Sequence, residues 1–393
     1  MGEQGSTAHA VRTRPRDRRE QILTAAATAF SRRGYHATTL AHIADAAGIS
    51  APAMYRHFGN KYELFAETNR VIAVRVRDRL DAVPVRPDEP EAELRNLLAS
   101  FATLIAENRH SADLHSREPS ILADADRALV REVRIALHRR ARGLLQAMRA
   151  DLSRADADVL AAAMFIVVVS PSTHRIPAAR KAIVDLTAGA AITLAAVELP
   201  PALPSGVSRG LVPSGRREAI LARAVDLFAA HGYHDVSVEQ IASAVGMPTS
   251  GVYRHFPSKQ AVLVAALSRA SDRATAAIAT GLASAADPAD ALSTLTGEYA
   301  RLCAADPAII TVYLSNLGAI DGDEHVALRR QQRTNVDEWA TWLQSARPDV
   351  GSAAARFLVH ASLNTMSDLT SGRHPVDSRR AAALGSAVLW APA

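Results

Sequence analysis

Residues 18–65 read RREQILTAAATAFSRRGYHATTLAHIADAAGISAPAMYRHFGNKYELF, and residues 216–263 read RREAILARAVDLFAAHGYHDVSVEQIASAVGMPTSGVYRHFPSKQAVL, with no gap in their alignment. The constant offset of 198 positions is too long for a solenoid repeat and indicates a duplicated domain pair. The two copies therefore begin with the same short domain, which we call a head. Identical positions include Arg18/Arg216, Ile22/Ile220, Leu23/Leu221, Phe30/Phe228, Gly34/Gly232, Tyr35/Tyr233, Ile43/Ile241, Gly48/Gly246, Tyr55/Tyr253, Arg56/Arg254, His57/His255, Phe58/Phe256 and Lys61/Lys259.

Each head shows the start and stop signals of short helices. Gly34 and Gly232 are placed to end a first helix, because glycine accepts the left-handed backbone of a C-terminal cap. Thr39 then occupies an N-cap position, and Ser237 followed by Gln240 forms the pattern of a capping box. The first helices are predicted from apolar residues at helical spacing, namely Ile22, Ala26, Ala29 and Phe30, and Ile220, Ala224, Leu227 and Phe228.

A third helix follows a short turn in each head. The second helices are expected to stop at Gly48 and Gly246, and the third to run from about Ala51 to His57 and from about Thr249 to His255. Helix, short glycine-containing turn and helix make a helix-turn-helix unit. Strand signals are scarce along the whole chain, so we predict an all-α fold.

The third-helix segments carry a family resemblance. The runs GISAPAMYRHFGNK and GMPTSGVYRHFPSK, with the preceding T-x-x-x-I-A pattern of the second helix, resemble the recognition-helix signature of TetR-family regulators. The resemblance covers both heads over about fifty residues each. It implies a DNA-binding transcription regulator, usually a repressor, whose partner is double-stranded DNA.

The heads supply the candidate DNA contacts. Small residues at the start of the recognition helix let the backbone approach base edges, and the tyrosines, arginines and histidines that follow can reach phosphates. A lysine at the start of the fourth helix can place its ammonium on a phosphate oxygen. The candidates are Thr39, Ser50, Ala51, Pro52, Ala53, Tyr55, Arg56, His57 and Lys61, with Ser237, Thr249, Ser250, Gly251, Tyr253, Arg254, His255 and Lys259.

Some of these positions have an alternative reading. Only three of the 45 basic residues are lysines, and two of them are equivalent, which shared descent of the repeats would also explain. The tyrosines of the Tyr-Arg-His-Phe run could pack in the core instead of contacting phosphate. His36 and His234 flank a turn, where we expect neutral caps or surface residues. Core positions are expected at Phe58, Phe256, Ile43, Ile241, Tyr35 and Tyr233.

Helix-rich sequence that differs between the copies follows each head, and we call these segments the bodies. The expected order is a basic arm at 1–16, a head at 17–65, a body at 66–198, a linker rich in Pro, Gly and Ser at 199–215, a head at 216–263 and a body at 264–393. By resemblance, pairing helices lie at about 155–169 with 178–198, and 353–369 with 379–390. One chain then forms an intramolecular pseudo-dimer, with a homodimer as the alternative.

The resemblance also implies a small-molecule effector. Similarity to actinobacterial tandem regulators of lipid and sterol operons favours an acyl-CoA or a steroid-derived compound. Because the two recognition helices differ in sequence, we expect an asymmetric operator. The candidate pocket residues, for which plain core packing is the alternative, are Phe101, Met148, Phe165, Tyr299, Tyr313, Asn316, Trp339 and Trp342.

Composition and missing motifs narrow the classes further. The chain has 48% hydrophobic residues, a net charge of +5 and one cysteine, so we expect a globular cytoplasmic protein without disulfides and without membrane contact. Signature motifs of nucleotide-binding, zinc-protease and serine-hydrolase enzymes are absent from the sequence. No cofactor, metal or enzymatic activity is expected. The competing function is a ligand sensor or scaffold in which only one head binds DNA.

Overall fold

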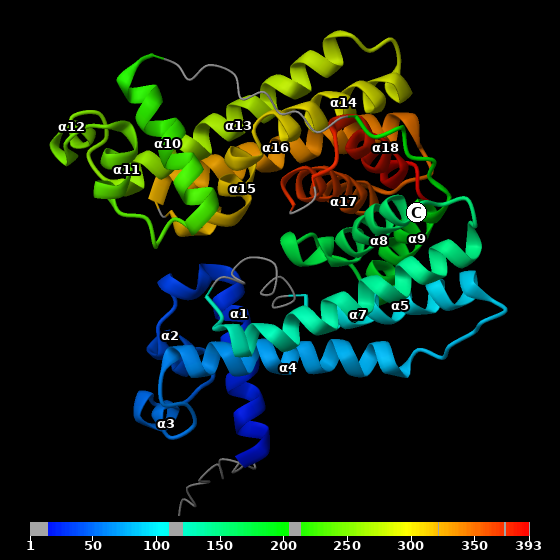
Figure 1. The fold of residues 1–393 in the computed structure, drawn as a ribbon, viewed down its shortest axis with the longest axis horizontal. Helices are drawn as coiled ribbons and strands as arrows, with labels where there is room; N and C mark the ends of the chain where they lie inside the picture. Colours follow the sequence, from blue (N-terminus) through cyan, green and yellow to red (C-terminus); the bar gives the residue numbers. More distant parts are fainter. Residues whose placement is uncertain (1–14, 110–120, 204–213, 321, 373–374, 393) are drawn as a thin grey trace, which may run out of the picture.

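The computed structural model describes residues 15–109, 121–203, 214–320, 322–372 and 375–392. Within these ranges every regular element is a helix, which confirms the prediction of an all-α fold. Residues 1–14 of the expected basic arm and residues 204–213 of the expected linker lie outside the described ranges. The chain is arranged as two similar helical units whose bodies lie against one another (Figure 1).

The first head comprises α1 (Pro15–Ala37), α2 (Leu40–Ala46) and α3 (Ala51–Tyr55), and α4 (Lys61–Ala82) continues from it into the body. Gly34 breaks the helical backbone of α1 with φ 76° and ψ 166°, as expected of a stop signal. Thr39 caps α2, because its side chain accepts a hydrogen bond from the backbone N–H of His42 at 3.2 Å. The third helix ends at Tyr55, two residues before the predicted end.

The second head repeats this arrangement in α10 (Arg216–His231), α11 (Val238–Val245), α12 (Thr249–Tyr253) and α13 (Lys259–Ala283). The predicted capping box is confirmed, since Ser237 and Gln240 exchange side-chain and backbone hydrogen bonds. Gly232 and Gly246 end their helices with φ of 86° and 71°. These backbone angles explain why glycine stands at both stops.

The bodies keep the offset of 198 positions although their sequences differ. The first contains α5 (Pro90–Glu107), α7 (Asp124–Met148), α8 (Arg154–Val169), η1 (Ser170–Thr173), α9 (Arg180–Thr193) and η2 (Leu194–Ala196). The second contains α14 (Pro288–Ala305), α15 (Pro307–Asn316), η3 (Leu317–Ala319), α16 (Gly322–Ala346), α17 (Ser352–Ser371) and α18 (Ser378–Leu389). The starts of α5, α7, α8 and α9 each reappear 198 residues later.

The last two helices of each body join the repeats. Helix α8 packs against α17 and α9 against α18, and one hydrophobic cluster extends through both bodies. Met164 and Met366 are fully buried in it. The side chain of Asn364 donates a hydrogen bond to Thr173 Oγ1 at 3.0 Å, and Arg380 forms an ion pair with Asp156. The predicted intramolecular pseudo-dimer is therefore the arrangement of the chain.

The most apolar helix lies inside this junction. Among the described residues, Arg154–Thr173 has the length and composition of a membrane span, with a mean hydropathy of 1.6. The helices Pro288–Ala305 and Pro307–Ala319 meet at an angle of 96°, and they reach this length and composition only when the two are counted as one span. Because 61% of the Arg154–Thr173 window is buried, its apolar surface serves the contact between the repeats.

Candidate nucleic-acid interface

The recognition helices α3 and α12 are short and are held by one buried side chain each. Met54 and Val252, at equivalent positions, are 0% and 1% exposed. The next residues, Tyr55 and Tyr253, are 59% and 49% exposed, so they do not belong to the core. Their hydroxyl groups are therefore accessible to a partner, as a contact with DNA phosphate requires.

Both recognition surfaces lie at the same side of the molecule, away from the paired helices α8, α9, α17 and α18 (Figure 1). The exposed predicted residues are Thr39, Ser50, Ala51, Pro52, Tyr55 and Arg56 in the first head and Ser250, Tyr253 and Arg254 in the second. Intermediate exposure is found at Ala53, His57, Lys61, Ser237, Thr249, Gly251, His255 and Lys259. None of the predicted contact residues is buried, so all remain available as candidates.

The two recognition helices start differently. The Ser50 side chain accepts a hydrogen bond from the Ala53 N–H at 3.3 Å and caps α3. Pro248 occupies the corresponding position of α12 and provides no side-chain cap. Gly251 lies against Met247, whose sulfur would be 3.2 Å from an added Cβ. The first turns of the two recognition helices therefore differ both in side chains and in capping.

The lysines at the start of α4 and α13 donate hydrogen bonds within the protein, whereas the sequence predicted that their ammonium groups would contact phosphate. Lys61 Nζ donates to the carbonyls of Tyr35 and His36 at 3.0 and 3.4 Å. Lys259 Nζ donates to Tyr233, His234 and Val236 at 2.9, 3.2 and 2.8 Å, which uses all three ammonium hydrogens. Each ammonium also lies over a tyrosine ring. The lysines thus tie the fourth helix to the turn after the first, leaving backbone N–H groups for phosphate.

Sequence reasoning missed a pair of arginines beside the recognition helices. The guanidinium of Arg19 lies 4.5 Å from the ring centre of Phe58, and that of Arg217 lies 4.4 Å from the ring centre of Phe256. Arg19 Nη1 also donates to the His57 carbonyl at 3.4 Å. The signal was present in the sequence, because both residues belong to the Arg-Arg-Glu run that opens the two copies.

The two heads also touch one another. The imidazoles of His36 and His234 stack with their centres 4.9 Å apart and an interplanar angle of 23°, and His36 Nε2 lies 3.8 Å from the Asp235 carboxylate. Burial lowers the pKa of both histidines. The expectation of simple turn or surface residues missed this contact. Equivalent residues meet where they lie on the pseudo-two-fold axis, and their offset of 198 could have suggested it.

The predicted pocket residues are not gathered into one cavity. Phe101 and Phe165 form an edge-to-face pair in the first body, with ring centres 5.6 Å apart. Trp339 is 1% exposed and packs against Tyr299 in the second body. Asn316 Nδ2 donates to the Val312 carbonyl of its own helix. The other predicted residues are Met148, in a surface groove beside α5, Tyr313, against the core of the second head, and Trp342, whose indole donates to Glu338.

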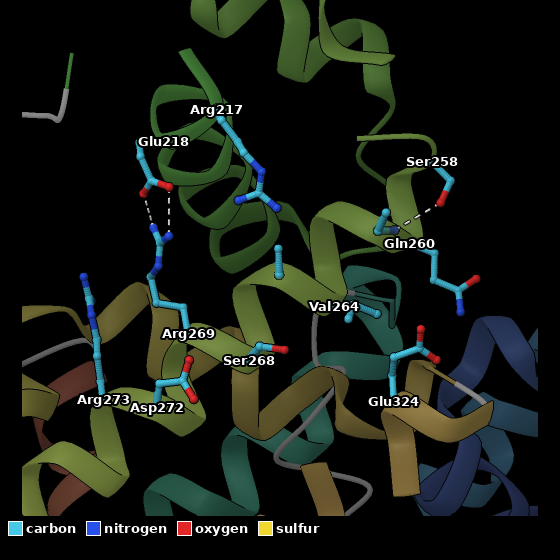
Figure 2. A pocket seen from close by; sticks show the side chains of 12 residues that line it. Arg217, Glu218, Ser258, Gln260, Val264, Ser268, Arg269, Asp272, Arg273 and Glu324 are labelled. Carbon is cyan, nitrogen blue, oxygen red and sulfur yellow. Dashed lines mark hydrogen bonds and ion pairs between the residues drawn. The ribbon is translucent and has the colours of Figure 1, made fainter. Parts of the chain in front are cut away.

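Hollows on the described part of the protein lie elsewhere. An open groove of about 880 Å³ runs beside the second head, between α10, α13 and the start of α16 (Figure 2). Glu218 and Arg269 face each other there as an ion pair, so their charges are matched. A cavity of about 630 Å³ lies between the repeats and is lined by histidine and arginine side chains.

Two short heads with exposed third helices, carried by a helical pseudo-dimer, define a two-headed helix-turn-helix protein. The sequence pattern described as "Bacterial regulatory proteins, tetR family" matches residues 22–68 and again residues 220–266. Both heads therefore belong to the TetR family.

Relatives with assigned roles are transcription regulators. The HTH-type transcriptional activator FasR of Mycolicibacterium smegmatis is 54% identical over 52 residues, which are 13% of this chain and 24% of FasR. The HTH-type transcriptional repressor KstR2 of the same organism is 35% identical over 100 residues, 25% of this chain and 48% of KstR2. The chain thus matches at most about half the length of these two relatives.

Solved structures of bacterial transcription regulators align with part of the chain. The ketosteroid transcriptional regulator KstR2 of Mycobacterium tuberculosis aligns with 45% of this chain and 93% of its own, at 20% identity and a TM-score of 0.39. AmtR of Mycobacterium smegmatis aligns with 45% of this chain and 85% of its own, at 24% identity and a TM-score of 0.40.

Proposed function

We propose that this protein is a DNA-binding transcription regulator that presents two recognition helices to one operator from a single chain. The observation that carries the proposal is the exposure of Tyr55 and Tyr253 on equivalent surfaces at the same side of the pseudo-dimer. Phosphate contacts would come from these tyrosines, from Arg56 and Arg254, and from the first backbone N–H groups of α4 and α13. The protein would act in the cytoplasm, as a monomer.

Both heads are proposed to bind DNA. Each retains a buried anchor, an exposed tyrosine and an exposed arginine, and the contact between His36 and His234 fixes one head against the other. A rigid spacing favours simultaneous binding to two half-sites. The alternative is a sensor in which only one head binds DNA. Neither head has lost its exposed tyrosine or arginine, so nothing favours this alternative.

The operator is proposed to be asymmetric. The first recognition helix opens with Ala51-Pro52-Ala53 and the second with Thr249-Ser250-Gly251, so the first turn carries hydroxyl side chains only in the second. Hydroxyl groups can hydrogen-bond to base edges, whereas alanine offers apolar contact with a thymine methyl group. A covalent pseudo-dimer always presents the two different helices together, which removes the need for a palindrome.

The regulation is proposed to be repression relieved by a small, lipid-derived effector such as an acyl-CoA or a steroid fragment. The name of KstR2 as a ketosteroid transcriptional regulator and repressor supports this chemistry by analogy. FasR is named as an activator, so the similarity of the heads alone does not fix the sign of regulation. The effector therefore has to be identified by its effect on operator binding.

Operator selection from random duplex DNA, followed by fluorescence anisotropy at several salt concentrations, tests the function. The expected result is a selected site with two different half-sites. The Tyr55→Phe and Tyr253→Phe variants should each weaken binding by about ten- to hundredfold, the loss of one hydrogen bond to a charged group. Similar weakening by both indicates two active heads. Weakening by only one would support the one-headed alternative, and no selected sequence would overturn the proposal.

A further inference from the structure

The cavity of about 630 Å³ between the repeats lies where three parts of the chain meet. Ser31 comes from α1 of the first head, and His174 and Arg175 come from the connection that follows η1 in the first body. Arg333 and His360 come from α16 and α17 of the second body. A molecule bound here would touch one head and both bodies, and its size falls within the usual range of small-molecule sites.

The charge of this cavity is predominantly positive. Its one acidic lining residue is Asp337, and the Asp337 carboxylate already accepts a hydrogen bond from Arg356 Nε at 2.6 Å. Arg333 forms no hydrogen bond or ion pair with any described residue. Arg175, Arg329 and Arg356 also line the cavity, so arginines outnumber the acidic residues of the lining.

His174 adds a buried hydrogen-bond donor to the wall. Arg109 Nη2 lies 3.0 Å from His174 Nδ1, and because a guanidinium can only donate, Nδ1 is the acceptor. Burial lowers the pKa of His174 far below its ordinary value, so the ring is neutral and carries its hydrogen on Nε2. That nitrogen is buried and has no partner among the described residues. A buried donor without an acceptor is costly.

The ring of His360 stacks on His174, with centres 4.3 Å apart and an interplanar angle of 19°. Its pKa is lowered to about 4 by burial, so this ring is neutral as well. Two stacked neutral imidazoles form a flat polar wall beneath the arginines. His174 and His360 both line the cavity, and the Nε2 hydrogen of His174 is left without an acceptor among the described residues.

The pseudo-symmetric position in the other repeat lacks several of these groups, although the counterparts of Arg329 and Arg175 are again arginines. Subtracting or adding 198 replaces Arg333 by Ile135, Arg356 by Asp158 and His360 by Ala162. His174 is replaced by Gly372, and Ser31 by Ala229. The helices themselves keep the same register in both repeats. The shared helical register of the two repeats therefore does not depend on Arg333, His174 or His360.

We propose that this cavity binds an oxyanion, carboxylate or phosphate, carried by a small organic molecule. The guanidinium of Arg333 supplies charge-assisted hydrogen bonds, and His174 Nε2–H supplies a neutral one. Because the site spans one head and both bodies, the bound molecule would alter how the first head is held. That regulatory consequence rests on the proposed function, whereas the binding site itself does not.

The test uses the full chain labelled with ¹⁵N-histidine and titrated with inorganic phosphate in one arm and acetate in the other. The imidazole resonance of His174 is assigned through its contacts with His360 and Phe357. The expected result is a saturable shift of the His174 Nε2 resonance with at least one oxyanion. A shift in only one arm supports the site and identifies the anion class. No saturable shift in either arm would overturn it.

Matched variants separate the site from general screening by salt. Arg333→Gln removes an exposed lining charge and should weaken the oxyanion by about tenfold, the value of one charge-assisted interaction. Arg330→Gln removes an exposed charge on the same helix outside the lining and should leave affinity unchanged. Equal weakening by both variants would contradict the proposal. Operator binding measured without added oxyanion reports separately on the proposed function.

Discussion

The heads and the bodies differ in how much sequence the two copies share. The heads repeat many identical residues, down to the run Tyr-Arg-His-Phe, whereas the bodies share little sequence and still place each helix at the same offset. A body needs only helix signals and apolar spacing, which many sequences satisfy. A head must also hold a two-turn fragment against DNA and position particular side chains. Divergence between copies therefore separates what packs from what performs a specific task.

The largest effect is expected from breaking a body. Trp339 is 1% exposed, and its counterpart in the first body is Ala141, which is 0% exposed. Trp339→Ala should lower the free energy of unfolding by about 3–5 kcal/mol because it leaves a large cavity. Urea denaturation measures the change. The control is Trp390→Ala, since that side chain is 44% exposed. If Trp339→Ala lowered the free energy of unfolding by less than the control does, the buried packing of Trp339 would be contradicted.

Replacing the lysine at the start of the fourth helix of a head should lower the free energy of unfolding by less than Trp339→Ala does. Lys259 donates to three backbone carbonyls, Lys61 to two, and Lys181 is 87% exposed. Lys259→Met should destabilise the second head by about 1.5–3 kcal/mol, because three backbone carbonyls lose a charged donor. Hydrogen exchange of the head amides measures it. Lys61→Met should destabilise the first head in the same way, and Lys181→Met should change the stability of neither head. If Lys259→Met left the stability of the head unchanged and lowered only the affinity for DNA, the Lys259 ammonium would be a phosphate contact, as the sequence predicts.

The caps of the recognition helices allow a smaller test. Ser50→Ala removes the N-cap of α3 and should destabilise the first head by about 1 kcal/mol. Pro248→Ser introduces a capping side chain at the equivalent position of α12, where none exists, and should stabilise the second head by a similar amount. Hydrogen exchange of each head gives the two values. If both variants shifted the stability of their heads in the same direction, the N-caps of α3 and α12 would not differ as described.

The smallest expected effect is a pH dependence of the contact between the heads. Burial lowers the pKa of His36 and His234 below their ordinary value of 6.5, and for His234 the charge of His36 contributes next. The unfolded chain therefore binds protons at a higher pH than the folded chain. The stabilisation is fully present above about pH 6.5 and is lost as pH falls through the lowered values.

This dependence can be measured from the melting temperature at pH values from about one unit above to about one unit below the ordinary histidine pKa of 6.5. The double variant His36→Gln with His234→Gln should show a shallower decrease than the wild type. The control is His57→Gln with His255→Gln, at equivalent positions on the recognition surfaces. An unchanged slope in the first variant would mean that the stacked pair contributes nothing.

Much of the fold could be predicted because its signals are local. Gly34, Gly232 and Gly246 mark helix ends by backbone conformation, and Ser237 with Gln240 marks a start by reciprocal hydrogen bonds. The roles of Lys61 and Lys259 could not be predicted. Their partners lie 23 to 26 residues earlier, and only the folded turn brings those carbonyls to the ammonium.

The cavity between the repeats could not be predicted from the sequence for the same reason. His174 and His360 are far apart in sequence and come together only through the packing of η1 and α17. Candidate pocket residues selected for aromatic character, such as Phe165 and Trp339, instead filled the core. The stacked pair His36 and His234 was within reach, because an exact offset identifies residues that a pseudo-two-fold axis can bring together.

The central claim is that one chain carries both heads to one operator, and the mass of the protein–DNA complex tests it most directly. Light scattering with size-exclusion chromatography, on a selected operator duplex, should give one chain of 41.8 kDa per duplex. Free protein should give the mass of one chain as well. A complex with two chains per operator would contradict the account, because it would show that each chain supplies only one working head.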